Sequence, residues 1–215
     1  MSTTPHIAVL GATGRTGICI VEQALARGWR VTALVRHPDP AHEPPEGLRI
    51  AQANMHDPGA LESALHGDFD AVISALGLFP RSPSTELSEG TSNVLSAMAK
   101  NDLRRLILIS SFGCGGTDRQ APLLLRLFAF KYLFRHTIPD KNRQEELVRN
   151  APVEHTILRP TGLYDGAPVG KLHIWNDEKP AGVKRFKSSR ADVARIALDA
   201  VEDRSMADQT LMMSE

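Results

Sequence analysis

Three glycines near the start of the chain have the spacing that a bound diphosphate requires. The run Gly11-Ala12-Thr13-Gly14-Arg15-Thr16-Gly17 follows an apolar stretch, residues 6–10, and precedes a helix-compatible stretch, residues 18–25. Backbone N–H groups at a helix N-terminus bind phosphate oxygens, and a missing Cβ permits their close approach. Glycines alone are weak evidence, because turns and helix–strand contacts also use them. A second apolar stretch, residues 30–35, completes the order that predicts a dinucleotide-binding βαβ unit.

The residue at the end of the second strand indicates which dinucleotide fits. An acidic residue there binds the ribose 2′-OH of NAD, whereas an arginine accommodates the 2′-phosphate of NADP. Arg36 holds this position, and Arg15 in the glycine turn can supply a second positive charge. Either arginine alone could be a solvated surface charge, but the two together favour a phosphate. The sequence predicts NADP(H), bound by Gly11, Thr13, Gly14, Arg15, Thr16, Gly17 and Arg36.

The rest of the chain alternates strands and helices, which is typical of a doubly wound, Rossmann-type parallel sheet. We expect strands over residues 6–10, 30–35, 48–53, 70–77, 104–111, 153–158 and 209–213, and helices over residues 18–25, 57–65, 85–100, 140–150 and 188–198. Asp57 and Ser189 are predicted helix caps. The expected organisation is α/β, one NAD(P)-binding domain over residues 1–215, with residues 163–188 as a small lobe over the substrate site.

Composition limits the classes of partner. The 25 Lys and Arg residues balance 25 Asp and Glu residues at a pI of 7.1, so no overall field favours nucleic acid or an anionic membrane. The N-terminal residues lack a leader pattern and no apolar run reaches about 18 residues, so we expect a cytoplasmic protein. The two cysteines lie in no ligand-rich cluster, which argues against a metal site. We expect a small-molecule substrate and a monomer or homodimer.

Residues 122–134 form an unusually apolar and aromatic segment. Arg126 and Lys131 interrupt it, and it is too short to span a bilayer. One interpretation is a helix packed on the domain. The other is that surplus apolar surface lines the substrate pocket or a dimer interface.

Motifs along nearly the whole chain resemble the atypical short-chain dehydrogenases/reductases. They are the glycine turn, Val35-Arg36, Ser110-Ser111, Lys141 with Glu145, Ile157-Leu158-Arg159-Pro160 and Arg190-Ala191-Asp192-Val193-Ala194. Within this family the chain is most similar to the NAD(P)H-binding group that includes biliverdin reductase B (flavin reductase) and the NmrA-like proteins. The resemblance is specific for fold and cofactor, and less so for substrate.

The resemblance implies a catalytic serine, a proton-donating tyrosine and a lysine four residues after that tyrosine. Ser111 and Lys141 match the serine and the lysine, but Thr137 stands where the tyrosine is expected. Tyr132 is followed four residues later by His136 and is interpreted as a packing residue. Biliverdin reductase B is similar in lacking the tyrosine. In that enzyme type hydride passes to a flat conjugated acceptor, and solvent can supply the proton.

The resemblance also implies further cofactor contacts. Asn54 matches a position against the adenine, and Leu76 and Gly77 would lie along the dinucleotide. Lys141 would hold the nicotinamide ribose, and Pro160 and Thr161 would lie near the nicotinamide. Arg159 has a competing interpretation as a surface ion-pair partner.

Three functional hypotheses follow. The leading one is an NADPH-dependent oxidoreductase that transfers hydride to a small planar or carbonyl acceptor, such as a flavin or quinone, which Ser111 polarises. The absent tyrosine also favours a non-catalytic, NmrA-like sensor that binds NADP(H). An NAD-dependent epimerase or dehydratase is the third hypothesis, and Arg36 and the missing tyrosine stand against it.

Overall fold

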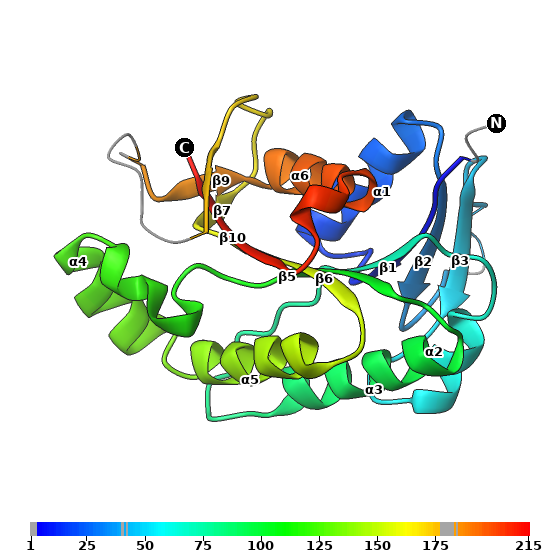
Figure 1. Ribbon diagram of the computed structural model, residues 1–215, viewed down its shortest axis with the longest axis horizontal. Coiled ribbons are helices and arrows are strands. Elements are labelled where there is room, and N and C mark those ends of the chain that lie inside the picture. Colours follow the sequence, from blue (N-terminus) through cyan, green and yellow to red (C-terminus); the bar gives the residue numbers. More distant parts are fainter. Residues whose placement is uncertain (1–3, 40, 42, 177–182, 184) are drawn as a thin grey trace.

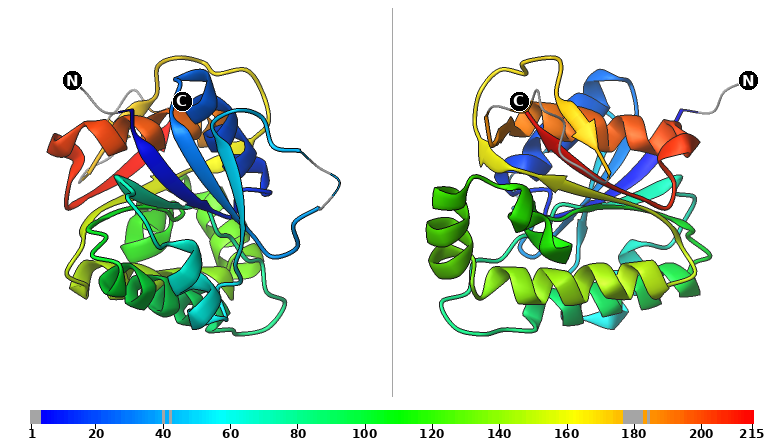
Figure 2. Two further views of the ribbon diagram at one scale, coloured as in Figure 1. Left: turned by 90° about the vertical axis from the view of Figure 1, so that its right-hand side faces the viewer. Right: turned by 60° about the vertical axis from the view of Figure 1, so that its left-hand side comes forward.

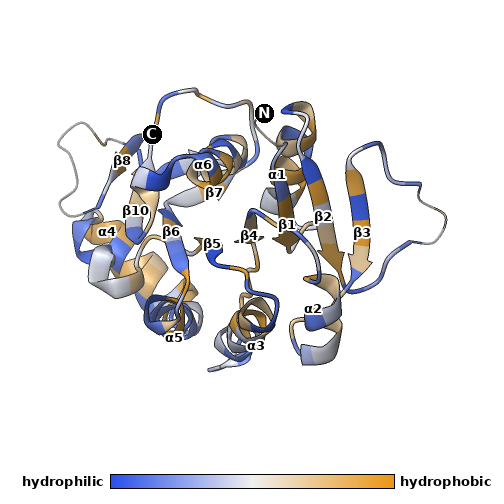
Figure 3. Ribbon diagram, turned by 45° about the vertical axis from the view of Figure 1, so that its right-hand side comes forward, coloured by the Kyte–Doolittle hydropathy of each residue, from blue (hydrophilic) through white to orange (hydrophobic). Residues whose placement is uncertain are grey.

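A computed structural model gives the structure of the protein and describes residues 4–39, 41, 43–176, 183 and 185–215. An eight-stranded sheet has the order β3-β2-β1-β4-β5-β6-β10-β8 (Figure 3). Its strands are β1 (His6–Leu10), β2 (Arg30–Val35), β3 (Leu48–Gln52), β4 (Ala71–Ser74), β5 (Arg105–Ile109), β6 (Glu154–Pro160), β8 (His173–Trp175) and β10 (Gln209–Ser214). All neighbours pair in parallel except β10 and β8. The predicted doubly wound fold is confirmed.

Helices cover both faces of the sheet (Figures 1 and 2). One face carries α1 (Arg15–Ala26) and α6 (Arg190–Glu202), and the other carries α2 (Pro58–Ala64), α3 (Glu86–Lys100) and α5 (Thr137–Asn150). The two predicted caps are present, because Asp57 accepts a hydrogen bond from the Ala60 N–H and Ser189 accepts one from the Asp192 N–H. Among the described residues, no helix is long and apolar enough to cross a bilayer.

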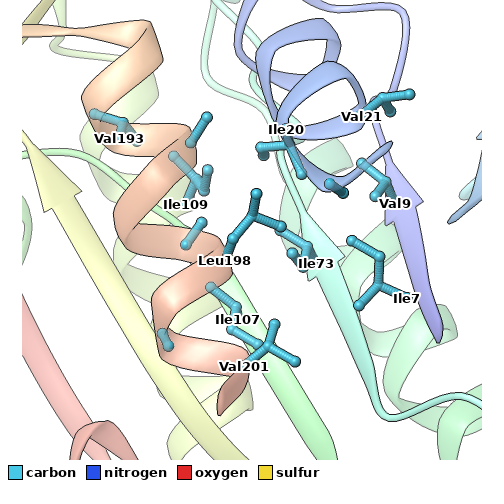
Figure 4. Packing of buried hydrophobic residues seen from close by; sticks show 14 of the residues in the cluster. Ile7, Val9, Ile20, Val21, Ile73, Ile107, Ile109, Val193, Leu198 and Val201 are labelled. Atoms are coloured by element: carbon cyan, nitrogen blue, oxygen red, sulfur yellow. The ribbon is translucent and has the colours of Figure 1, made fainter. Parts of the chain in front are cut away.

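Aliphatic side chains fill both interfaces between sheet and helices. On one face, Ile73 and Ile107 pack with Ile20 of α1 and Leu198 and Val201 of α6 (Figure 4). On the other face, Leu106 and Leu108 belong to a second cluster with Val94 and Met98 of α3. Successive residues of a strand point to opposite faces. A central strand such as β5 is therefore apolar on both faces after its first residue, Arg105, as its sequence predicted.

The C-terminal part differs in detail from the prediction. The last strand, β10, does not end the sheet but lies between β6 and the antiparallel edge strand β8. Two further strands, β7 (Gly162–Tyr164) and β9 (Lys187–Ser189), form a separate parallel pair. Strands of three residues are too short to show a hydrophobic period, which explains why sequence patterns did not indicate them. Residues 177–182 and 184 of the expected lobe lie outside the described residues.

The apolar segment, residues 122–134, forms one end of the molecule (Figure 1). The short α4 (Leu123–Leu125) is followed directly by a π-helix, η2 (Arg126–Leu133). Phe130 and Phe134 make ring contacts toward the body of the protein, but most other apolar side chains of the segment are exposed. The interpretation as a helix packed on the domain is therefore wrong for most of its length.

Candidate cofactor and active site

A cavity of about 270 Å³ lies at the carboxyl ends of β1, β2 and β4. Seven of the predicted cofactor residues line it: Gly11, Thr13, Gly14, Arg36, Asn54, Leu76 and Gly77. The other lining residues are Leu10, Leu34, Val35, Ala53, Met55, His56, Leu61, Ala75, Leu78 and Glu86. Parallel α/β sheets bind ligands at this edge. The cavity thus joins residues from six separate parts of the chain: 10–14, 34–36, 53–56, 61, 75–78 and 86.

The glycine turn provides a cradle that only glycine permits. Gly11 has a φ of +73°, and a Cβ there would lie 2.9 Å from the Ala75 carbonyl oxygen. A Cβ at Gly17 would lie 2.0 Å from the Gly11 carbonyl oxygen, which is inside van der Waals contact. Gly14 caps α1 without any side-chain hydrogen bond, so the N–H groups of the first turn are available to a ligand. The cradle fits a diphosphate.

Gly17→Ala tests the cradle. The new Cβ would force the turn away from α1, so we expect the dissociation constant for NADPH to rise about tenfold or more and the stability to fall by about 1–3 kcal/mol. Calorimetric titration and thermal unfolding measure the two effects. Gly59→Ala, in the first turn of α2, is the matched control because its Cβ would meet nothing closer than Asp57 Oδ1 at 3.6 Å. Unchanged NADPH affinity in Gly17→Ala would show that the diphosphate does not bind at this turn.

Of the two predicted arginines, only Arg36 lines the cavity. It follows β2, its side chain is exposed, and its carbonyl oxygen lies 3.4 Å from Gln52 Nε2. Arg15 instead pairs with Asp165, which also accepts a hydrogen bond from Arg190 at 2.8 Å. Thr16 and Gly17 lie in the first turn of α1, behind the cavity wall.

The side of the cavity around Asn54 includes residues that the sequence analysis did not identify. Asn54 Oδ1 accepts a hydrogen bond from the His56 N–H at 3.1 Å, so its amide is held in a turn after β3. Met55 packs against Gly90 of α3, where a Cβ would lie 2.7 Å from the Met55 sulfur. Glu86 is the one acid that lines the cavity, and His56 Nε2 lies 3.3 Å from its Oε1. Met55 and His56 adjoin Asn54 in sequence, but only the fold brings Glu86 to this cavity.

Lys141 and Ser111 lie at the carboxyl end of β5. Ser111 is the second residue after this strand, is half-buried, and donates a hydrogen bond from its hydroxyl to the Phe112 carbonyl oxygen at 3.1 Å. Lys141, on α5, is buried, and its Nζ lies 3.4 Å from the Ile109 carbonyl oxygen. Burial lowers the pKa of the Lys141 ammonium, although the nearby carboxylate of Glu145 opposes this shift.

A buried ion-pair network fixes α5 against the sheet. Glu145 Oε1 accepts hydrogen bonds from Ser110 Oγ at 2.5 Å and Arg159 Nε at 3.0 Å. Its Oε2 accepts from Arg159 Nη2 and from Arg149 Nη2, each at 2.5 Å. Burial alone raises the pKa of the Glu145 carboxyl, but the hydrogen bonds and charge of Arg159, together with its other partners, hold that pKa below its usual value. Lys141, one turn earlier on α5, is positioned by this network.

Arg159 is thus an ion-pair partner, but it is buried and not at the surface. The sequence motifs contained Glu145 and Arg159 separately, and the fold brings them into one ion pair.

Pro160 and Thr161 do not line the cavity. Pro160 is buried at the end of β6, and the Thr161 hydroxyl lies 3.0 Å from both Ser188 Oγ and Ser214 Oγ. These contacts connect β6 to β9 and β10.

Neither Tyr132 nor Tyr164 substitutes for the proton-donating tyrosine that the family motif places at position 137. Thr137 is buried in the first turn of α5. Tyr132 is exposed, with Lys131 Nζ 6.0 Å from its ring centroid. The Tyr164 hydroxyl donates to the carboxylate of Glu215, and this bond raises the pKa of Tyr164.

A row of aromatic rings begins next to Ser111. The Phe112 ring centroid lies 6.2 Å from that of Phe130, which lies 5.8 Å from that of Phe134. Phe79, in the loop after β4, continues the row at 6.3 Å from Phe134. At these separations the rings contact one another in tilted arrangements.

Cys114 is buried near the same network, and burial raises the pKa of its thiol to about 11. Its thiol therefore stays protonated at neutral pH and is a poor nucleophile.

Among the residues that the structure describes, no group of three or more His, Cys, Asp or Glu side chains could hold a metal ion.

Comparison with known proteins agrees with this geometry. Residues 11–204 match the protein family described as NAD(P)H-binding. An uncharacterized chloroplastic protein of Arabidopsis thaliana is 31% identical over 206 residues, which cover 92% of this chain and 72% of that protein. N-acetyl-alpha-D-glucosaminyl-diphospho-ditrans,octacis-undecaprenol 4-epimerase of Escherichia coli O157:H7 is 30% identical over 78% of this chain. The chain spans about half of that epimerase, 52% of its length.

Solved structures share the fold. A short-chain dehydrogenase/reductase of Veillonella parvula in complex with NADP superposes with a TM-score of 0.82 at 19% identity and covers 99% of this chain and 95% of that one. An anaerobillin reductase of Escherichia coli O157:H7 gives a TM-score of 0.81 at 24% identity, over 98% and 97% of the two chains. One relative is chloroplastic, and the cytoplasmic location expected for this chain stays a prediction.

Proposed function

Because the chain belongs to the NAD(P)H-binding family, we propose that it is an NADPH-dependent reductase that transfers hydride to a small planar or carbonyl acceptor, such as a flavin or quinone. The family match confirms the resemblance that the sequence motifs indicated. One observation carries the proposal: the glycine cradle, Arg36, Ser111 and Lys141 all lie along the carboxyl edge of one sheet. Bound NADPH supplies the hydride.

Each part of this edge has a distinct task in the proposal. The cradle of Gly11, Gly14 and Gly17 holds the diphosphate, and Arg36 binds the ribose 2′-phosphate. Lys141 holds the nicotinamide ribose, and its position is fixed by the bonds of Glu145 to Ser110 and Arg159. Ser111 donates a hydrogen bond from its hydroxyl to the acceptor atom where negative charge develops, and solvent supplies the proton.

A planar acceptor is supported by two features. Thr137 replaces the tyrosine that would protonate a carbonyl product, so an acceptor whose proton comes from solvent suits the site better. The aromatic row from Phe112 to Phe79 begins at the residue after Ser111, and its last ring, Phe79, is exposed and can stack on a flat ligand. A flat conjugated acceptor needs positioning more than it needs a general acid.

A steady-state assay tests the proposal. NADPH oxidation is followed with panels of flavins, quinones and linear tetrapyrroles, and we expect saturable turnover with at least one planar acceptor. The absence of tyrosine at Thr137 also favours a second candidate, a non-catalytic NADP(H) sensor. A sensor would bind NADPH in calorimetry and turn over none of the panel. An epimerase would retain NAD on purification, which mass spectrometry of the released nucleotide detects.

Ser111→Ala tests the acceptor contact. Loss of a hydrogen-bond donor to developing charge lowers turnover by about 10- to 100-fold, while the dissociation constant for NADPH stays the same. Ser96→Ala, on the exposed side of α3, is the matched control and should leave both values unchanged. An unaltered turnover number in Ser111→Ala would mean that this hydroxyl only caps the loop after β5.

A further inference from the structure

The apolar segment exposes most of its side chains. All residues from 122 to 128 are exposed, and the exposed fractions reach 71% for Leu124, 67% for Phe128 and 71% for Leu133. Ala129, Phe130 and Phe134 are half-buried, so the exposed apolar surface is broad but does not include the side that faces the domain. Figure 1 and the right-hand view of Figure 2 show this segment at one end of the molecule.

The same region carries only positive charge. Arg119, Arg126, Lys131 and Arg135 are exposed, and residues 119–139 contain no aspartate or glutamate. Within the part of the chain that the structure describes, no ion pair joins these four side chains to a carboxylate. The chain as a whole is neutral. The balance of total charge therefore conceals a local basic and apolar region.

We propose that the apolar segment binds the interfacial region of an anionic phospholipid membrane. Leu124, Phe128 and Leu133 would enter the boundary between headgroups and acyl chains, and Arg126 and Lys131 would lie at the lipid phosphates. Long basic side chains can reach the headgroups while their apolar stems stay in the lipid. The segment is too short to span the bilayer, so the protein lies on the membrane surface.

Two other occupants fit the segment less well. A second copy of the chain, joined by a two-fold axis, would place the four basic side chains of one segment against the same four of its partner. A groove on another protein would cover one side of the helix and leave the apolar residues on its other sides in water. A lipid interface can cover the whole exposed part of the segment at once, and its anionic headgroups match the basic side chains.

The inner side of the segment links this surface to the site. Phe130 and Phe134 contact Phe112 and Phe79, so the exposed leucines lie on the same helix as two rings of the aromatic row. Membrane binding would hold the outer end of that row at the lipid surface. The proposal stands on exposure and charge, and it does not depend on the reductase activity.

Vesicle flotation tests the proposal with the full chain. We expect the protein to float with vesicles of phosphatidylcholine mixed with phosphatidylglycerol at low salt, and to be released as salt rises. Pure phosphatidylcholine vesicles should bind it about tenfold less. Leu124→Glu with Phe128→Glu, and separately Arg126→Glu with Lys131→Glu, should each reduce partitioning by about tenfold or more.

Matched controls separate the segment from general effects of charge. Leu147→Glu with Val169→Glu introduces the same charges at exposed apolar positions elsewhere, and Arg30→Glu with Arg49→Glu reverses exposed arginines on β2 and β3. Both controls should float like the parent chain. NADPH affinity and thermal unfolding show that each variant is folded.

Three results would overturn the proposal. The first is that the parent chain binds neither type of vesicle. The second is equal binding to both types, because the basic residues would then have no role. The third is a concentration-dependent dimer in light scattering that Leu124→Glu with Phe128→Glu abolishes, without any vesicle binding; this would assign the segment to a second copy of the chain.

Discussion

Arg36→Glu lowers the affinity of the protein for NADPH by about 10- to 100-fold and leaves the affinity for NADH unchanged or raised. Arg36 lines the cavity where β2 ends, and it is the one arginine or lysine among the described residues that line the cavity. A charge-assisted hydrogen bond to a phosphate contributes about 1.5–3 kcal/mol, which corresponds to this range of affinity. A glutamate at this position would repel the 2′-phosphate and could accept a hydrogen bond from the 2′-OH of NADH instead.

Calorimetric titration with NADPH and NADH at two salt concentrations measures the effect. Part of the loss for NADPH should disappear at high salt, because Arg36 is exposed and its charge is screened. Arg30→Glu is the matched control, since Arg30 is exposed at the opposite end of the same strand. Equal losses in both variants, or unchanged NADPH affinity in Arg36→Glu, would contradict the role of Arg36 and favour NAD as the cofactor.

Glu145→Ala destabilises the fold by about 3–5 kcal/mol at neutral pH. The substitution leaves the buried guanidinium of Arg159 without its carboxylate partner, and it removes the acceptor of the Ser110 hydroxyl. An unpaired buried charge costs more than the ion pair contributes, which is why the loss is large. Urea unfolding measures the change. Glu146→Ala, at the exposed neighbouring position, should change stability by less than about 0.5 kcal/mol.

The same network predicts a pH dependence. The pKa of Glu145 is lowered in the folded state, so its carboxylate contributes stability above the unfolded pKa of about 4.3. That contribution is lost as pH falls through the lower, folded pKa. The stability difference between the parent chain and Glu145→Ala should therefore be constant from neutral pH to about pH 5 and shrink below about pH 4. A difference that does not depend on pH would mean that lost packing, and not lost charge, causes the destabilisation.

The sequence by itself determined the features of this protein that depend only on residues close together in the chain. The glycine cradle needs only a strand, a turn without Cβ atoms and a helix, all within residues 6–26. The caps at Asp57 and Ser189 are equally local, and the apolar core of β5 shows in four consecutive residues, 106–109. Arg36 follows from its position at the end of β2. Hydrogen bonds and hydrophobic periods of this kind span only a few residues, so a linear pattern reveals them.

Tertiary structure alone decided the contacts between distant residues. Glu145 meets Ser110 and Arg159 across 35 and 14 positions of sequence, and Glu86 reaches a cavity whose glycines lie at the start of the chain. Arg15 pairs with Asp165, which no local pattern indicates. The exposure of residues 122–128 has the same origin. An apolar run predicts burial, but whether another element covers it depends on how the whole chain packs.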